Sequence, residues 1–155
     1  MLDIRHDFAP PRRIGCAILL DTSGNLLLQQ RDDIPNILQP GKISLFGGHC
    51  ENGETNLECA VREIEEEISH PVPADRFELL LRYDGADIDR ESEPNEGGML
   101  DCEIYLVRDI PRDKLIITEG ALFISAPDDL ARIDGKLAPL ARFALAEFAR
   151  RRTSE

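Results

Sequence analysis

The stretch GHCENGETNLECAVREIEEEISH, residues 48–70, carries the strongest local pattern in this chain. Thr55 followed three residues later by Glu58 matches the capping box, in which two side chains satisfy free amides at a helix start. Proline cannot continue a helix, so we expect Pro71 to end this one. Apolar residues recur at spacings of three and four and mark one buried face: Leu57, Ala60, Val61, Ile64 and Ile68. The stretch therefore predicts a helix over residues 55–68, reached through a glycine-containing loop.

The charges on this predicted helix lie on one side. Glu63, Glu66 and Glu67 are related by three and four positions, so their carboxylates share a face. Like charges at this spacing repel, and a hard divalent cation such as Mg²⁺, which prefers oxygen ligands, offsets the repulsion. Arg62 can pair with Glu54 or with a neighbouring carboxylate and hold the loop against the helix. The alternative is a solvated acidic face, but such a face would carry interleaved lysines, and Arg62 is the only basic residue of the predicted helix.

Apolar runs and turn-forming residues elsewhere indicate further strands and one more helix. Residues 1–12 are expected to form an extended lead-in and residues 84–100 a mobile polar loop. Strands mixed with helices predict an α+β or α/β sandwich. We expect strands over residues 13–20, 26–31, 42–46, 76–83, 102–107 and 115–124, and a final helix over 137–151.

The composition limits the classes of function. The chain has 155 residues, the usual size of one domain, and a formal net charge of −12. So acidic a chain binds a nucleic-acid backbone poorly, whereas divalent cations can bridge it to a small phosphate compound. No apolar run approaches the length of a membrane span and the amino terminus is too charged for a signal peptide, so no membrane partner is expected. Four cysteines without a CxxC pair favour reduced thiols and a cytoplasmic protein, and His49, Cys50 and Cys59 match no standard zinc spacing.

The quoted stretch resembles the Nudix box, Gx₅Ex₇REUxEExGU, in which U is a bulky aliphatic residue. The residues that fall in place are Gly48, Glu54, Arg62, Glu63, Ile64, Glu66 and Glu67. The pattern departs at its end, where Ser69 stands for the glycine and His70 for the final aliphatic residue. It also departs before the box, where Phe46 stands in place of a proline ahead of Gly47. No departure removes a carboxylate, but Ser69 replaces the glycine that normally adopts the left-handed cap conformation.

The resemblance implies a Nudix α/β/α sandwich, a mixed sheet flanked by helices, as a single domain over residues 1–155. It implies a Nudix-type pyrophosphate hydrolase, in which water attacks a nucleoside diphosphate linked to a group X. The implied metal is Mg²⁺, or alternatively Mn²⁺. The expected partner is a small nucleotide derivative, nucleotide sugar or nucleoside triphosphate. The sequence leaves open whether the chain forms a homodimer. The implied metal ligands are Glu63, Glu66, Glu67 and the carbonyl of Gly47, with Glu54, Arg62 and Gly48 in support.

Two assignments stay open. The three helix glutamates are implied to be catalytic, but the general base is expected from outside the helix. Glu119 competes for that role with three acids of the polar loop, Glu91, Glu93 and Glu96. The alternative function is a Nudix-like sensor that binds a nucleotide without cutting it, and a structural acidic domain is a weaker alternative. The intact carboxylate set argues against the sensor, and the sequence does not name the substrate.

Overall fold

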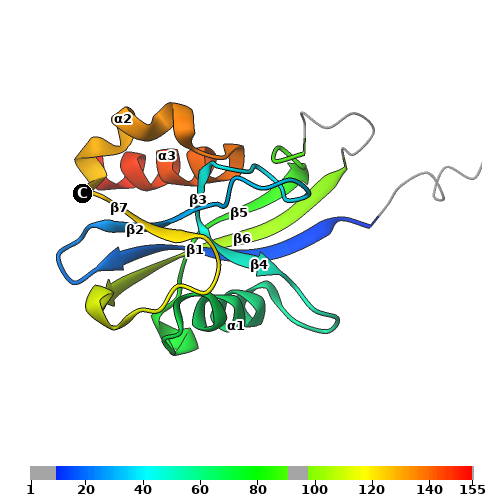
Figure 1. The fold of residues 1–155 in the computed structure, drawn as a ribbon. Helices are drawn as coiled ribbons and strands as arrows, with labels where there is room; N and C mark the ends of the chain where they lie inside the picture. The colour runs from blue at the N-terminus through cyan, green and yellow to red at the C-terminus, as the bar shows by residue number, and fades with distance from the viewer. Residues whose placement is uncertain (1–9, 91–97, 155) are drawn as a thin grey trace, which may run out of the picture.

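The computed structural model describes residues 10–90 and 98–154 (Figure 1). In these residues one sheet contains β1 (Arg12–Asp21), β2 (Leu26–Gln30), β3 (Ile43–Ser44), β4 (Phe46–His49), β5 (Glu78–Ala86), β6 (Met99–Ile110) and β7 (Ala121–Ser125). The α-helices are α1 (Asn56–Ile68), α2 (Leu130–Ile133) and α3 (Pro139–Thr153). Single 3₁₀ turns are η2 (Ala74–Arg76), η3 (Arg112–Lys114), η4 (Pro127–Asp129) and η5 (Asp134–Lys136). No helix in the described part of the chain is long and apolar enough to cross a membrane.

The sheet is mixed, as predicted. Its strands run in the order β3-β2-β1-β6-β5, and β4 pairs with β1 while β7 pairs with β2. β1 and β6 are parallel, and the other pairs are antiparallel. Helix α1 covers one face of the sheet, and α2 and α3 cover the other (Figure 1). This arrangement is the predicted α/β/α sandwich.

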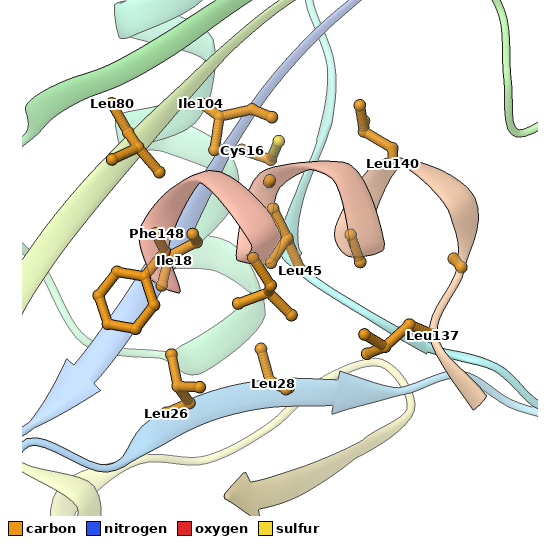
Figure 2. Packing of buried hydrophobic residues seen from close by; sticks show 14 of the residues in the cluster. Cys16, Ile18, Leu26, Leu28, Leu45, Leu80, Ile104, Leu137, Leu140 and Phe148 are labelled. Carbon is orange, nitrogen blue, oxygen red and sulfur yellow. The ribbon is translucent and has the colours of Figure 1, made fainter. Parts of the chain in front are cut away.

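Strand β1 is buried on both faces because helices cover both sides of the sheet. Ile14, Cys16 and Ile18 belong to the apolar cluster under α3. Ala17 and Leu19 alternate with them and belong to the cluster under α1. Figure 2 shows the first cluster, where side chains of α3 gather over those of β1 and β2. The second cluster fixes α1, and with it the glutamates of the box, against the sheet.

The structure corrects two boundaries near the site. The predicted strand over 42–46 is two strands, because the chain leaves β2 and pairs with β1 after Leu45. The predicted loop over 84–100 is shorter, since residues 84–86 continue β5 and residues 99 and 100 begin β6. Residues 87–90 and 98 lie outside the strands, while residues 91–97 of that predicted mobile loop lie outside the described residues, as do residues 1–9 of the predicted lead-in.

The predicted strand over 115–124 is wrong in its first half, because only β7 pairs with the sheet. The amide of Ile116 donates to the carbonyl of Ile68 at 3.1 Å, and the amide of Thr118 donates to that of Glu67 at 3.0 Å. These donors satisfy free carbonyls at the end of α1 and are therefore not used in a ladder.

Helix α1 starts as predicted and stops differently. Both bonds of the capping box are present, from the Glu58 amide to Thr55 Oγ1 at 3.1 Å and from the Thr55 amide to Glu58 Oε1 at 3.0 Å. At the other end, Ser69 adopts the left-handed conformation with φ of 55°. Ser69 itself occupies the cap position, so the helix ends before Pro71 is reached and the expectation about Pro71 is wrong.

Candidate functional site

Two glycines let α1 lie close to β4. A Cβ atom at Gly48 would lie 2.4 Å from Cδ of Glu63, and one at Gly47 would lie 2.4 Å from Cβ of Cys16. Gly47 also has φ of 149°, which residues with side chains rarely adopt. The carboxylate of Glu63 therefore occupies the space that a side chain at position 48 would fill.

Glu67 is the most deeply placed of the helix glutamates, with 4% of its surface exposed. Its Oε1 accepts from the Gly47 amide at 3.0 Å, and its Oε2 accepts from Gln29 Nε2 at 3.1 Å. Burial above all, and the nearby charges of Glu63 and Glu119, raise the pKa of Glu67 to about 8. The prediction of an acidic face open to a cleft therefore fails for Glu67, which points into the protein.

Glu66 and Glu63 lie further out on α1. The side chain of Glu66 is 58% exposed and that of Glu63 is 19% exposed. Both carboxylates contact Arg62, whose Nη1 donates to Glu63 Oε1 at 2.9 Å and to Glu66 Oε2 at 3.3 Å. Burial raises the pKa of Glu63, and the contact with Arg62 opposes the rise. The three carboxylates thus form a series from solvent to interior.

Arg62 also holds the loop before α1, as predicted. Its Nε and Nη2 donate to the two oxygens of Glu54 at 2.6 and 2.9 Å. Nη2 donates in addition to the carbonyl of His49 at 3.1 Å, and Glu54 accepts from the amide of Glu51 at 2.9 Å. The Arg62 guanidinium, with this amide, lowers the pKa of Glu54 to about 2. The planar fork of Arg62 therefore ties the loop of the box to its helix.

Glu119 lies next to the acids of α1. Gln29 Nε2 donates to the carbonyl of Glu119 at 3.0 Å, and Thr118 is bonded to the end of α1. The charge of Glu119 raises the pKa of both Glu63 and Glu67. The structure thus brings together residues that are 52 and more positions apart in sequence. The competing acids of the polar loop, at positions 91, 93 and 96, lie outside the described residues.

A cavity of about 460 Å³ adjoins these acids. Glu63 and Glu119 contribute to its lining together with the glycine pair. In the described part of the chain no Phe or Tyr side chain lines it. The other lining residues include Arg12, Arg31, Arg90, Ile37, Leu38, Leu45 and Leu140. Carboxylates, guanidinium groups and aliphatic surface together suit a charged ligand with an uncharged organic part.

The donor atoms here fit a hard divalent cation. Four glutamates supply carboxylate oxygens, the ligand type that Mg²⁺ prefers: Glu63, Glu66, Glu67 and Glu119. The space at Gly48, which a Cβ would fill, leaves the Glu63 carboxylate facing the cavity. Within residues 10–90 and 98–154, no three acidic, histidine or cysteine side chains are already arranged around a metal position. Arg62 takes up oxygens of Glu63 and Glu66 that a cation would need.

Sequence reasoning missed two supporting contacts. Gln29 is 3% exposed and bonds both the carboxylate of Glu67 and the carbonyl of Glu119. Arg13 Nη2 donates to Asn56 Oδ1 at 3.1 Å and so ties β1 to the first residue of α1. A polar residue following a run of buried leucines was the available signal for Gln29. Nothing in the sequence connected Arg13 with Asn56, because 43 positions separate them.

Comparison with known proteins agrees with this geometry. The family model of the NUDIX domain matches residues 9–142. The chain is 31% identical over 109 residues to "Nudix hydrolase 3" of Arabidopsis thaliana, a match that covers 68% of this chain and only 13% of that protein.

Solved structures are similar over most of the chain. A MutT NUDIX hydrolase from Burkholderia pseudomallei is 25% identical with a TM-score of 0.69, covering 90% of this chain and 98% of that one. A MutT protein from Methanosarcina mazei is 16% identical with a TM-score of 0.72, covering 98% and 99%. A bifunctional NMN adenylyltransferase/ADP ribose pyrophosphatase from Francisella tularensis is 16% identical with a TM-score of 0.68, covering 96% of this chain and 44% of that one. The box, the sandwich and the family match together show that this chain belongs to the Nudix hydrolase family.

Proposed function

We propose that this protein is a divalent-metal-dependent enzyme that hydrolyses a diphosphate linkage in a nucleoside diphosphate joined to a group X. The observation that carries the proposal is that Glu63 and Glu119 line one cavity and that the charges of both act on the buried Glu67. Carboxylates on a cavity wall repel a diphosphate unless cations are present. A cation-dependent reaction of an anionic substrate accounts for that arrangement.

Glu63, Glu66, Glu67 and the carbonyl of Gly47 would hold Mg²⁺, with Mn²⁺ as the alternative. When bound, such a cation neutralises the diphosphate and lowers the pKa of a bound water. Glu67 is already oriented by Gly47 and by Gln29, so it needs little further ordering.

The remaining residues of the box position these ligands. Arg62 holds Glu54 through two hydrogen bonds and thereby fixes the loop that leads from β4 into α1. Gly48, which has no side chain, leaves room for the Glu63 carboxylate. We assign Glu54, Arg62 and Gly48 a supporting role for this reason.

Glu119 is the proposed general base. Glu119 lines the cavity, and its charge acts on both Glu63 and Glu67. It comes from a segment separate from α1, so it can face a water molecule that the helix carboxylates do not reach. There it would accept the proton that the attacking water loses.

The proposed substrate is a small nucleotide-type diphosphate. The cavity volume of about 460 Å³ is in the range of small-molecule sites. Because its described lining offers no Phe or Tyr, a nucleobase would lie against aliphatic side chains and guanidinium planes. We further propose a single cytoplasmic domain, supported by four free cysteines of which three are buried.

A screen with Mg²⁺ tests the function. Nucleotide sugars, ADP-ribose and nucleoside triphosphates are incubated with the protein, and the products are identified by mass spectrometry. The proposal expects a nucleoside monophosphate and phosphorylated X from at least one class. Tight binding of a nucleotide without any product in the presence of Mg²⁺ would instead establish the sensor.

A further inference from the structure

A second group of charges lies on the same cavity, beside β4. Arg12 donates Nε and Nη2 to the two oxygens of Asp87 at 2.8 and 3.0 Å, and Asp87 is only 3% exposed. Nη1 of Arg12 lies 3.5 Å from Nε2 of His49, the residue that follows Gly48 in the chain. The Arg12–Asp87 pair is therefore next to β4, which carries the two glycines beside the acid site (Glu63, Glu66, Glu67 and Glu119). Arg12 and Asp87 are 75 positions apart, so no local pattern in the sequence predicts the pair.

Arg90 approaches the same carboxylate without hydrogen bonding to it. Its Nε lies 3.7 Å from Asp87 Oδ2, an oxygen that Arg12 already occupies. Among the described residues Arg90 Nε has no hydrogen-bond partner, although the atom is buried. A buried donor on a charged group is costly to leave without an acceptor. Arg90 also lines the cavity, so a ligand there can supply that acceptor.

The cavity lining carries charges of both signs. Its arginines are Arg12, Arg31 and Arg90, and its acids are Asp89 and the two glutamates of the site described above. Asp89 is already engaged, since its Oδ1 accepts from an amide in the first turn of α3 at 3.1 Å. Nε of Arg12 donates to Asp87 and Nε of Arg31 donates to the carbonyl of Leu38 at 2.7 Å, whereas Nε of Arg90 has no acceptor among the described residues. Arg90 is therefore the arginine of this lining whose donor is left for a ligand.

We propose that Arg90 is a specificity-determining residue that binds an anionic group of the substrate next to the diphosphate held at the acid site. Guanidinium groups suit phosphate and carboxylate oxygens because their donors form a planar fork. The substrate class narrows accordingly to diphosphates whose group X carries a further phosphate or a carboxylate, and neutral sugars are disfavoured. This inference rests on the proposed function for the position of the diphosphate.

Calorimetric titration of the full chain in the presence of Mg²⁺ tests the role of Arg90 with two matched pairs of probes. The affinities for inorganic tripolyphosphate and pyrophosphate are compared to measure the preference for an added phosphate. The affinities for UDP-glucuronate and UDP-glucose are compared to measure the preference for an added carboxylate. In at least one pair, the wild type is expected to bind the compound with the additional anionic group about tenfold or more tightly. That is the effect of a charged hydrogen bond. Arg90→Gln should reduce that preference to within about twofold.

Two further variants complete the design. Arg90→Lys keeps the charge but lacks the Nε donor, so its preference should fall between those of the wild type and Arg90→Gln. Arg82→Gln is the control, because Arg82 pairs with Asp101 at 3.0 Å and does not line the cavity. An equal preference in wild type and both Arg90 variants, with all proteins folded by circular dichroism, overturns the inference. Loss of the preference in a protein that hydrolyses none of the screened compounds supports the anion site and contradicts the proposed function.

Discussion

Gly48 and Glu63 share one space: a Cβ atom at position 48 would lie 2.4 Å from Cδ and 2.5 Å from Oε2 of the glutamate. The backbone of Gly48, unlike that of Gly47, is not in the left-handed region. Gly48 is therefore required for clearance and not for conformational freedom. The close contact between β4 and α1 can therefore be tested by adding a single methyl group at position 48.

Gly48→Ala should displace the Glu63 carboxylate and lower turnover. The atoms that the new methyl group meets are the end of a flexible side chain, so the free energy of unfolding, measured in urea, should change little. The control is Gly135→Ala, because a Cβ there would meet nothing within 4 Å. In a Glu63→Ala background Gly48→Ala should lower turnover little further, and fully independent losses would show that the two residues do not collide.

Glu66→Gln should lower turnover by about two orders of magnitude or more at saturating Mg²⁺, because it removes one of the charges proposed to hold the cation. The side chain of Glu66 is 58% exposed, so its packing is unaffected. Stability should stay level or rise slightly as repulsion on α1 is relieved. Glu65→Gln, at an exposed position of the same helix, is the control and should keep full activity. Near-normal activity of Glu66→Gln would remove Glu66 from the metal site.

Glu67 should make the metal-free protein less stable as the pH rises. Burial raises its pKa in the folded protein to about 8 from an ordinary value of 4.5, so the unfolded chain loses the proton first. The contribution is complete below pH 4.5 and is lost as the pH rises through 8, by on the order of a few kcal/mol. Thermal unfolding with EDTA between pH 5 and about 9 measures this. Glu67→Gln should flatten the profile, and identical slopes in the two proteins would contradict the burial of an ionisable group here.

Glu119→Gln should lower kcat strongly and leave KM little changed, since ground-state binding is retained. The hydrogen bond that holds this segment goes from Gln29 to the backbone carbonyl of Glu119, so the substitution leaves it intact. Gln variants at 91, 93 and 96 provide the comparison, because those acids were the competing candidates in the sequence. Full activity of Glu119→Gln, with a large loss in one of the other three, would transfer the role of base to the polar loop.

The sequence was most informative where the decisive interactions are local. The capping box at Thr55 and the glutamates at positions 63, 66 and 67 of α1 all follow from spacings of three and four residues. The fork between Arg62 and Glu54 spans eight positions and was also foreseen. Such patterns are readable because helix geometry alone sets which side chains meet.

The sequence was least informative where tertiary contacts override local preference. Residues 115–118 have apolar side chains typical of a strand, but two of their amides bond the end of α1. Ser69 adopts a conformation usually left to glycine. Glu67 shares a helix face with Glu66 in the sequence pattern, and packing against β2 through Gln29 buries it. None of these outcomes follows from spacing, because each depends on a distant segment.

The most direct test of the central claim is hydrolysis in H₂¹⁸O of a diphosphate found in the screen, with Mg²⁺ and then with EDTA. The account predicts two phosphorylated products, one of which carries a single ¹⁸O atom because water has attacked one phosphorus. The reaction should stop in EDTA and resume when Mg²⁺ is restored. Labelled product formed at an undiminished rate in EDTA, or substrate bound with no product at all, would contradict it.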